Sequence, residues 1–215
     1  MFHVLIISLP YLLKGAAITV WLSLATISLG TLLGFALGTV GAVGPRPVRA
    51  AVAVYVFVLR GVPILVVMFL GYYVLPALGY KVDAYVAVGA AMVVYVGAFV
   101  SEIVRGAILA VPSSQIAAAR SLGMRRWPML REVVLPQAFR LATPPLLNTA
   151  LTTVKQTSYV SVVGAWELSY AAREVVERTL AAFEIFLGVM VLYFIICYPL
   201  SLAARHLERR YAFAS

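Results

Sequence analysis

Residues 15–45, GAAITVWLSLATISLGTLLGFALGTVGAVGP, form the longest stretch of this sequence without a charged side chain. An α-helix needs about 20 apolar residues to cross the hydrocarbon core of a membrane, and this stretch is longer than that. Shorter uncharged runs follow at residues 61–80, 84–101 and 185–204. Their apolar residues are continuous, whereas the strands of a membrane barrel alternate in polarity. The pattern therefore predicts an all-α membrane protein.

The overall composition supports this class. Hydrophobic residues make up 63% of the 215-residue chain and charged residues only 12%, against about 25% charged residues in soluble domains. The net charge of +9 does not indicate a nucleic-acid partner, because the basic residues lie between the apolar runs rather than among aromatic residues on a soluble face. One cysteine and two distant histidines predict no internal disulfide and no metal site.

Charge placement predicts the topology. With five spans at residues 12–43, 50–76, 84–108, 138–165 and 182–204, the connections alternate between the two sides of the membrane. One side receives eleven basic residues: Arg46, Arg49, Arg105, Arg120, Arg125, Arg126, Arg131, Arg140, Arg205, Arg209 and Arg210. The other side receives four: Lys14, Lys81, Arg173 and Arg178. By the positive-inside rule the first side is cytoplasmic, so the N-terminus is expected outside and the C-terminus inside.

The fourth expected span, 138–165, is the least regular. Pro136, Pro144 and Pro145 each remove a backbone donor and are expected to kink or break the helix. Polar residues in this span should face the bundle interior or a wet cavity, because lipid does not tolerate them. Those expected to line a path for a solute are Asn148, Lys155, Gln156, Thr157 and Ser158. The alternative is that these groups join helices within the bundle or cap a helix break.

The longest hydrophilic connection, residues 111–135, reads VPSSQIAAARSLGMRRWPMLREVVL. Ser114 suits a helix N-cap, Gly123 suits a left-handed helix end, and Pro128 suits the start of a second short helix. The sequence thus predicts a helical elbow with a small-residue surface and nearby arginines. Such an elbow suits docking of another protein, but an amphipathic segment resting on lipid headgroups would carry the same pattern.

The spacing in this loop resembles the cytoplasmic motif of ABC importer permeases: Glu-Ala-Ala, three residues, Gly, nine residues, Ile, one residue and Leu-Pro. The matching residues are Ala118, Ala119, Gly123, Val133, Leu135 and Pro136. Ala117 stands in place of the motif's glutamate, which predicts a less rigid helix start or one fewer charge contact. In that family the elbow is a coupling helix in a groove of the ATPase. The resemblance therefore implies that the docking residues are Gln115, Ala117, Ala118, Ala119, Arg120, Leu122, Gly123, Met124 and Arg125.

Further segments, in order along nearly the whole chain, resemble the amino-acid branch of that family, the histidine/glutamine permeases. They are Leu12–Gly15, Arg60–Pro63, Glu102–Gly106, Leu135–Arg140 and Lys155–Ser158. The resemblance implies a type I importer permease fold of five helices, a single domain over residues 1–215 in the bacterial inner membrane. It also implies two ABC ATPase subunits, a second permease subunit, identical or related, an extracytoplasmic amino-acid-binding protein and surrounding membrane lipid.

Some matched residues suggest gating and selectivity. Arg60 and Pro63 lie near an expected helix break. Glu102 and Arg105 share one helical face, and all four are expected to act as gate or structural elements. Gln156 stands where this branch often has aspartate, and a neutral amide does not favour a cation. The sequence therefore predicts import of a neutral or acidic amino acid rather than arginine or lysine.

The chain itself is not expected to be an enzyme. A phosphate-binding Walker loop needs Gly-Lys-Ser/Thr, and none of Lys14, Lys81 and Lys155 follows a glycine. We therefore expect no catalytic residue and no cofactor here, with ATP and Mg²⁺ on a separate ATPase. Two other classes remain as alternatives: an ion-coupled secondary transporter of small polar solutes, which usually shows internal repeats, and a membrane enzyme of lipid metabolism.

Overall fold

The structure is a computed structural model that describes residues 3–212, apart from the side chains at positions 208 and 210–212. The side chain of Arg210, assigned by the charge pattern to the basic side, lies outside the described residues. In chain order the elements are α1 (His3–Val43), α2 (Arg46–Gly61), α3 (Ile64–Ala77), α4 (Ala84–Leu109), α5 (Ser113–Ser121), α6 (Arg126–Met129), a π-helical turn η1 (Leu130–Val134), α7 (Leu135–Gln156), a 3₁₀ segment η2 (Thr157–Val163), α8 (Leu168–Thr179) and α9 (Ala182–Ala212). Within these residues there is no strand, which confirms the all-α prediction.

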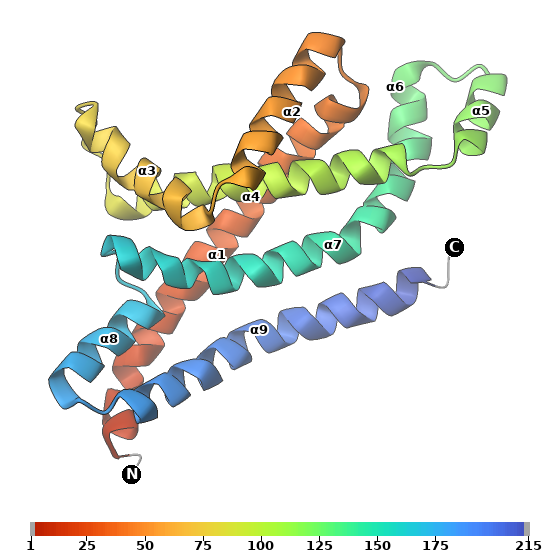
Figure 1. The fold of residues 1–215 in the computed structure, drawn as a ribbon. Helices are drawn as coiled ribbons and strands as arrows, with labels where there is room; N and C mark the ends of the chain where they lie inside the picture. Colours follow the sequence, from red (N-terminus) through yellow and green to blue (C-terminus); the bar gives the residue numbers. More distant parts are fainter. Residues whose placement is uncertain (1–2, 213–215) are drawn as a thin grey trace.

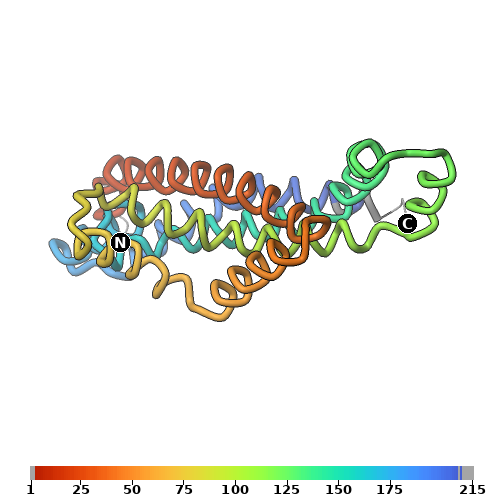
Figure 2. The backbone as a smooth tube through the Cα atoms, turned by 90° about the horizontal axis from the view of Figure 1, so that it is seen from above, coloured from red at the N-terminus to blue at the C-terminus, as the bar shows by residue number. Residues whose placement is uncertain are grey.

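The long helices form a bundle with distinct ends. Figure 1 shows α4, α7 and α9 running roughly alongside one another and α1 crossing them, and Figure 2 shows α5 and α6 projecting from the end opposite to α8. Three helices, α1, α4 and α9, are long and apolar enough to cross a membrane, and α2 with α3 forms a fourth, bent candidate. α7, at 22 residues, is also long enough to cross a membrane but is less apolar than these helices. The count of five spans therefore stays a prediction.

Glycines allow α1 and α4 to pack closely. Gly30, Gly34 and Gly38 recur every four residues on α1 and are buried. A Cβ atom at Gly34 would lie 2.4 Å from Cβ of Val100, and one at Gly30 would lie 2.8 Å from Cγ1 of Val96. No real Cβ fits at such distances, so the two backbones approach more closely than any larger residue would permit.

The bend between α2 and α3 follows from one proline. Val62 is extended (φ −109°, ψ 135°), as expected for a residue that precedes proline, and Pro63 occupies the N-cap position of α3. The two helix axes therefore meet at 104° across a two-residue break. This confirms the expected helix break beside Arg60.

Two expectations about α7 were wrong. Pro144 and Pro145 do not interrupt the helix, which is continuous from Leu135 to Gln156. The prolines deprive the carbonyls of Arg140 and Leu141 of their N–H partners, yet the helical backbone continues through both positions. Pro136 does not stop the helical backbone either, which continues from α6 through η1 into α7; the irregularity lies in the π-helical turn Leu130–Val134, directly before this proline.

The irregular part of this span is its C-terminal end. After Gln156 the chain tightens into the 3₁₀ segment η2 and closes at Gly164, whose φ of 83° is left-handed. Such a conformation favours glycine. The helical span is thus shorter than the expected 138–165.

The start of the elbow also differs from the prediction. α5 begins at Ser113, with Pro112 at the N-cap position and no side-chain cap, so Ser114 does not cap the helix. The φ of proline is fixed near the helical value, and the helix after Pro112 begins at Ser113, one residue before Ser114. Ala117 is then the fifth residue of α5, where a capping-box glutamate has no role. Gly123 does adopt the expected left-handed conformation, with φ 74°.

Three buried clusters surround these contacts. One joins α4 to η1 and α7, a second joins the N-terminal half of α1 to α8 and α9, and a third joins α1, α3, α4 and η2. Each cluster links segments far apart in sequence, and the first holds the C-terminal half of α4 against the N-terminal part of α7.

The glycine contact between α1 and α4 can be tested directly. We expect Gly34→Ala to lower the free energy of unfolding by about 1–3 kcal/mol, because overpacking forces the helices apart. Gly106→Ala is the matched control: its Cβ would meet nothing within 4 Å, and helix propensity favours alanine. Thermal unfolding of the purified chain in detergent measures both. Equal stability of the two variants would contradict the close-packing account.

Candidate functional site

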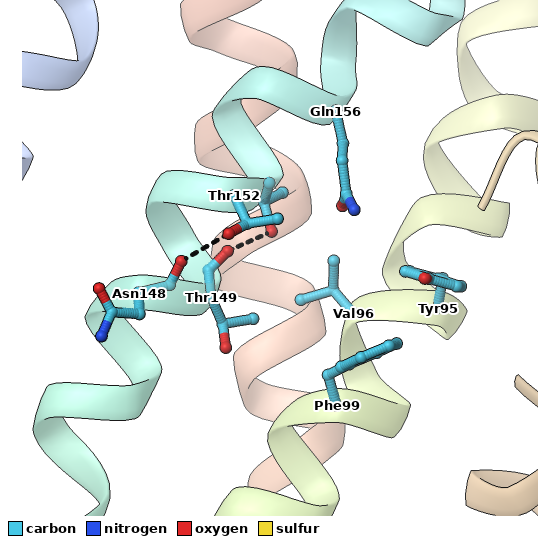
Figure 3. A pocket seen from close by; sticks show the side chains of 8 residues that line it. Tyr95, Val96, Phe99, Asn148, Thr149, Thr152 and Gln156 are labelled. Atoms are coloured by element: carbon cyan, nitrogen blue, oxygen red, sulfur yellow. Dashed lines mark hydrogen bonds between the residues drawn. The ribbon is translucent and has the colours of Figure 1, made fainter. Parts of the chain in front are cut away.

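A cleft of about 250 Å³ lies between α4 and α7. From α4 it is lined by Tyr95, Val96 and Phe99, and from α7 by Asn148, Thr149, Thr152, Thr153 and Gln156. Figure 3 shows the aromatic rings on one wall and the amide and hydroxyl groups on the other. None of its lining residues is charged.

The polar wall follows from the helical repeat of α7. Asn148, Thr152 and Gln156 are four residues apart and therefore share one face. The Gln156 amide points into the space beside Val96, whereas Asn148 lies at the rim with its amide directed away from the rings (Figure 3). Thr149 also lines this wall. Sequence reasoning selected the two amides but missed the threonines, although their spacing places them on the same face.

The hydroxyls and amides differ in what they offer a ligand. The hydroxyls of Thr149, Thr152 and Thr153 donate to the carbonyls of Pro145, Asn148 and Thr149, at 2.9, 2.9 and 2.8 Å. Their donors are thus used within the helix, and they present oxygen lone pairs. Neither amide side chain is hydrogen-bonded to another described residue, so Asn148 and Gln156 each keep donors and an acceptor for a solute.

Lys155 lies in a different cleft. Its neighbours there include Tyr193, Cys197 and Tyr198 of α9, in a space of about 450 Å³ between α7 and α9. Adjacent residues of a helix point about 100° apart, which separates Lys155 from Gln156. The structure therefore does not bring the lysine to the amide-lined wall.

Thr157 and Ser158 serve the helix end. Their hydroxyls donate to the carbonyls of Val154 and Lys155 at 2.7 and 2.8 Å, three residues back. Thr157 is fully buried. Neither residue lines the α4–α7 cleft, and their contacts are those of the alternative role, closing a helix.

The elbow projects beyond the bundle. α5 ends in paired hydrogen bonds in which Gly123 N–H donates to Arg120 at 2.9 Å and Met124 N–H donates to Ala119 at 3.2 Å. This is the Schellman arrangement, which needs the left-handed glycine. Leu122 is 82% exposed and Trp127 is 76% exposed, so the turn presents apolar side chains among arginines.

The comparisons with known proteins place this architecture in a family. The family described as binding-protein-dependent transport system inner membrane component matches residues 30–213. The chain belongs to this family. This confirms the resemblance to ABC importer permeases, and the chain is therefore a permease.

Characterised relatives of the permease carry amino-acid transporter names. The glutamine transport system permease protein GlnP of Escherichia coli is 34% identical over 205 residues, covering 94% of each chain. The L-cystine transport system permease protein TcyB of Bacillus subtilis is 36% identical over 202 residues, covering 94% of this chain and 86% of TcyB.

Solved structures agree on the fold. A crystal structure of an amino acid ABC transporter with histidines superimposes with a TM-score of 0.90 and 30% identity, covering 98% of both chains. The inward-facing methionine ABC transporter MetNI gives a TM-score of 0.77 at 20% identity over 94% of this chain and 97% of its own, a likeness of fold alone.

The expected gate or structural residues of the permease lie together near α2. Glu102 and Arg105 form a two-bond ion pair, with Nη2–Oε1 at 2.7 Å and Nε–Oε2 at 3.0 Å. Arg60 places its guanidinium 5.6 Å from the centre of the Phe99 ring, on the helix that carries this pair. Because Phe99 also lines the α4–α7 cleft, Arg60 is one side chain away from that cleft. Pro63 sets the adjacent bend.

A buried carboxylate at the α8 end of the permease was missed from sequence. Glu167 is fully buried and accepts hydrogen bonds from Ser169 N–H, Tyr170 N–H and the Thr19 and Tyr193 hydroxyls, at 2.8, 3.0, 3.0 and 3.2 Å. It thereby caps α8 and ties it to α1 and α9. Burial raises the pKa of this carboxyl, and the hydrogen bonds act in the opposite direction. A capping acid ahead of an amphipathic helix was the available sequence signal.

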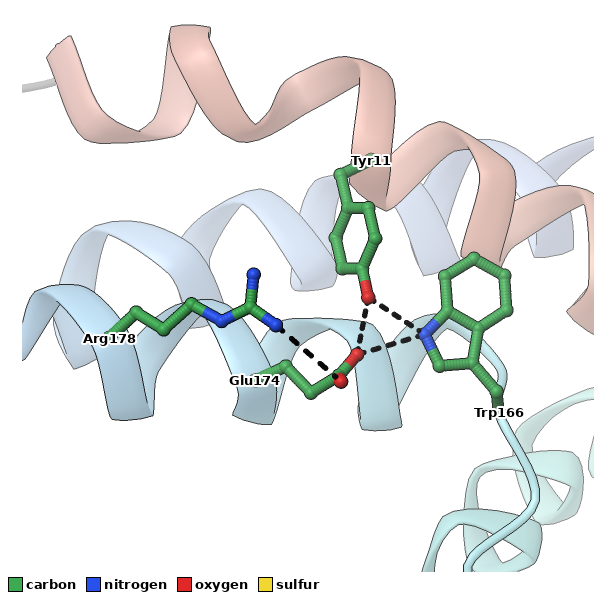
Figure 4. A network of polar contacts seen from close by, with 4 residues as sticks. All are labelled: Tyr11, Trp166, Glu174 and Arg178. Carbon is green, nitrogen blue, oxygen red and sulfur yellow. Dashed lines mark hydrogen bonds and ion pairs between the residues drawn. The ribbon is translucent and has the colours of Figure 1, made fainter.

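A second network joins the same elements nearer the surface (Figure 4). Glu174 accepts hydrogen bonds from the Tyr11 hydroxyl and, at 2.9 Å, from the Trp166 indole N–H. Arg178 approaches the same carboxylate at 3.8 Å. α8 is therefore attached to α1 by polar contacts on two sides.

Removal of the buried carboxylate should loosen α8. We expect Glu167→Ala to lower the free energy of unfolding by at least about 2 kcal/mol, because buried donors lose their acceptor. Glu177→Ala, an exposed acid on the same helix, should change it little. Thermal unfolding in detergent measures both, and similar midpoints for the two variants would show that the cap does not hold α8.

Proposed function

We propose that the permease forms half of the translocation pathway of an ATP-driven importer of amino acids. The observation that carries the proposal is the α4–α7 cleft, whose wall offers amide and hydroxyl groups without a charged side chain. Its volume of about 250 Å³ is below the range for drug-sized ligands, so it suits a small solute. The amino-acid transporter names of GlnP and TcyB support the same solute class.

The chemistry of the wall favours an uncharged or acidic side chain in that solute. The Gln156 amide can donate to a carboxylate and accept from an ammonium group. No carboxylate lines the cleft to stabilise an additional cation. The cleft is also open on one side of a single chain, and a second permease subunit, identical or related, would complete the pathway.

We propose five spans, with α7 as the fourth in order between α4 and α9. A span that lines a pathway carries polar residues, and α7 is for that reason less apolar than its neighbours. The basic connections assign the α5–α6 end to the cytoplasm, the N-terminus to the outside and the C-terminus to the inside of the bacterial inner membrane. An extracytoplasmic amino-acid-binding protein would deliver the solute at the α8 end.

We propose that the elbow within residues 111–135 docks one of two ABC ATPase subunits, which bind ATP and Mg²⁺. The surface from Gln115 to Arg125 projects from the bundle and keeps a defined shape through Gly123. Ala119, expected among the docking residues, is buried and packs inward instead, so its neighbours form the exposed surface. Ala117 is exposed within this surface. Its replacement of the family glutamate removes one charge that would face the ATPase, whereas the helix start is set by Pro112.

The shape of the elbow should control ATPase binding. We expect Gly123→Val to abolish co-purification of the importer's ATPase subunit, because a β-branched residue does not tolerate positive φ. Gly164→Val is the matched control: its φ of 83° imposes similar strain, but at the α8 end. Pull-down through a tagged permease gives the readout. Retention of the ATPase by Gly123→Val, or equal loss in both variants, would contradict docking at the elbow.

The charge of the cleft should control solute preference. In the reconstituted importer, we expect ATPase activity to respond to neutral or acidic amino acids more than to arginine or lysine. Gln156→Asp should shift the preference toward arginine and lysine by at least about tenfold, since an introduced carboxylate attracts the added cation.

Gln137→Asp provides the control for this change. Gln137 lies on the same helix but lines none of these clefts, and its amide donates to the Val133 carbonyl at 2.9 Å. This variant should leave the preference unchanged. Stronger stimulation of the unmodified importer by arginine or lysine would contradict the proposed selectivity.

A further inference from the structure

A third cleft, of about 580 Å³, lies where α2 meets α1 and α4. Its charged lining consists of Arg46, Arg49, Arg60, Arg105 and Glu102, with Phe57 on the apolar side. Arg60, Glu102 and Arg105 are the expected gate or structural residues, but neither solute binding in the α4–α7 cleft nor ATPase docking at the elbow uses this cleft.

The cleft has an excess of positive charge. Glu102 is already engaged by Arg105 through two hydrogen bonds. Within the described part of the chain, Arg46, Arg49 and Arg60 have no carboxylate within ion-pair distance. Four guanidinium groups thus share one carboxylate, which leaves an excess of positive charge that an anion can balance. Guanidinium groups bind phosphate with two parallel hydrogen bonds, which makes phosphate the matching anion.

The position of the two outer arginines adds to this preference. Arg46 and Arg49 lie in and beside the first turn of α2, a turn that contains no acidic residue. The N-terminal end of a helix dipole is positive and repels these cations. An anion bound between them would relieve both the charge repulsion and the dipole.

One wall of the cleft is apolar, which suits a ligand that has an apolar part. Beyond the arginines, the wall of α2 is apolar, and Phe57 is 81% exposed. Figure 2 shows α2 on the outside of the bundle, starting toward the end that carries α5 and α6. Basic pockets between spans on the cytoplasmic side bind acidic lipid headgroups. A free phosphate ion would use the arginines but not the apolar wall.

We propose that this cleft binds one anionic phospholipid of the cytoplasmic leaflet. Arg46 and Arg49 hold its phosphate group, and an acyl chain lies along the exposed Ala53 and Phe57. Glu102 limits the affinity, because its charge opposes the headgroup while it holds Arg105. This site relies on the membrane orientation proposed above but not on ATP-driven transport.

The test uses the full-length permease alone, purified in neutral detergent and titrated with phosphatidylglycerol, phosphatidylcholine or inorganic phosphate. Native mass spectrometry counts the bound lipids. We expect one phosphatidylglycerol per chain, bound in preference to phosphatidylcholine and not displaced by inorganic phosphate. Arg46→Gln with Arg49→Gln should weaken its binding about thirtyfold, at about 1 kcal/mol for each arginine.

Two further variants make the result specific. Arg131→Gln with Arg140→Gln removes the same charge from exposed residues outside the cleft, and should leave phosphatidylglycerol binding unchanged. Glu102→Gln should tighten it about fivefold. The Glu102→Gln variant therefore tests the site even if the double variant at Arg46 and Arg49 does not fold.

Several results would overturn the proposal. They are unchanged phosphatidylglycerol binding when Arg46 and Arg49 are replaced, an equal loss in the Arg131 and Arg140 control, or no gain with Glu102→Gln. Displacement by inorganic phosphate would make this a soluble-anion site. Loss of self-association without loss of lipid would assign the cleft to a second copy of the chain. None of these measurements uses ATP or an amino acid, so they leave the proposed transport function untouched.

Discussion

The close approach of α1 and α4 is the constraint on which the bundle depends. Membrane helices gain little hydrophobic attraction from one another, so packing must come from backbone proximity, and glycines supply it at Gly30, Gly34 and Gly38. The same helix uses Gly15 at its other end, where a Cβ would lie 2.9 Å from the Leu168 Cα. α1 thereby holds α4 with its C-terminal half and α8 and α9 with its N-terminal half, and α7 is positioned between them.

α7 shows how a polar helix fits into such a bundle. Its threonine hydroxyls bond to carbonyls of their own helix, which leaves few unsatisfied donors to bury. The unpaired amide of Gln156 faces α4, and the Lys155 ammonium faces α9. One helix therefore presents an uncharged wall and a cationic wall to two different neighbours, and the two walls do not share a solute. Polar contacts at Glu167 and Glu174 hold the α8 end of this assembly.

Features that depend on local stereochemistry were predictable. The residue before Pro63 had to be extended, Gly123 suited a left-handed helix end, and residues three apart on one turn placed Glu102 beside Arg105. Features that depend on the tertiary surroundings of a residue were not predictable from the sequence. Pro144 and Pro145 remain inside a helix, and the residues by themselves do not reveal whether a proline ends a helix or is accommodated within it.

By itself, the sequence determined an all-α membrane protein, a charge asymmetry between its two sides and a glycine-closed elbow, because uncharged length, charge placement and backbone sterics act locally. Only the tertiary structure decided which polar residues meet. It separated Lys155 from Gln156, brought Thr19 and Tyr193 to Glu167, and collected distant arginines around one cleft. The physical reason is that a side chain's partner lies across a helix interface, and that interface is set by the packing of helices far apart in the chain.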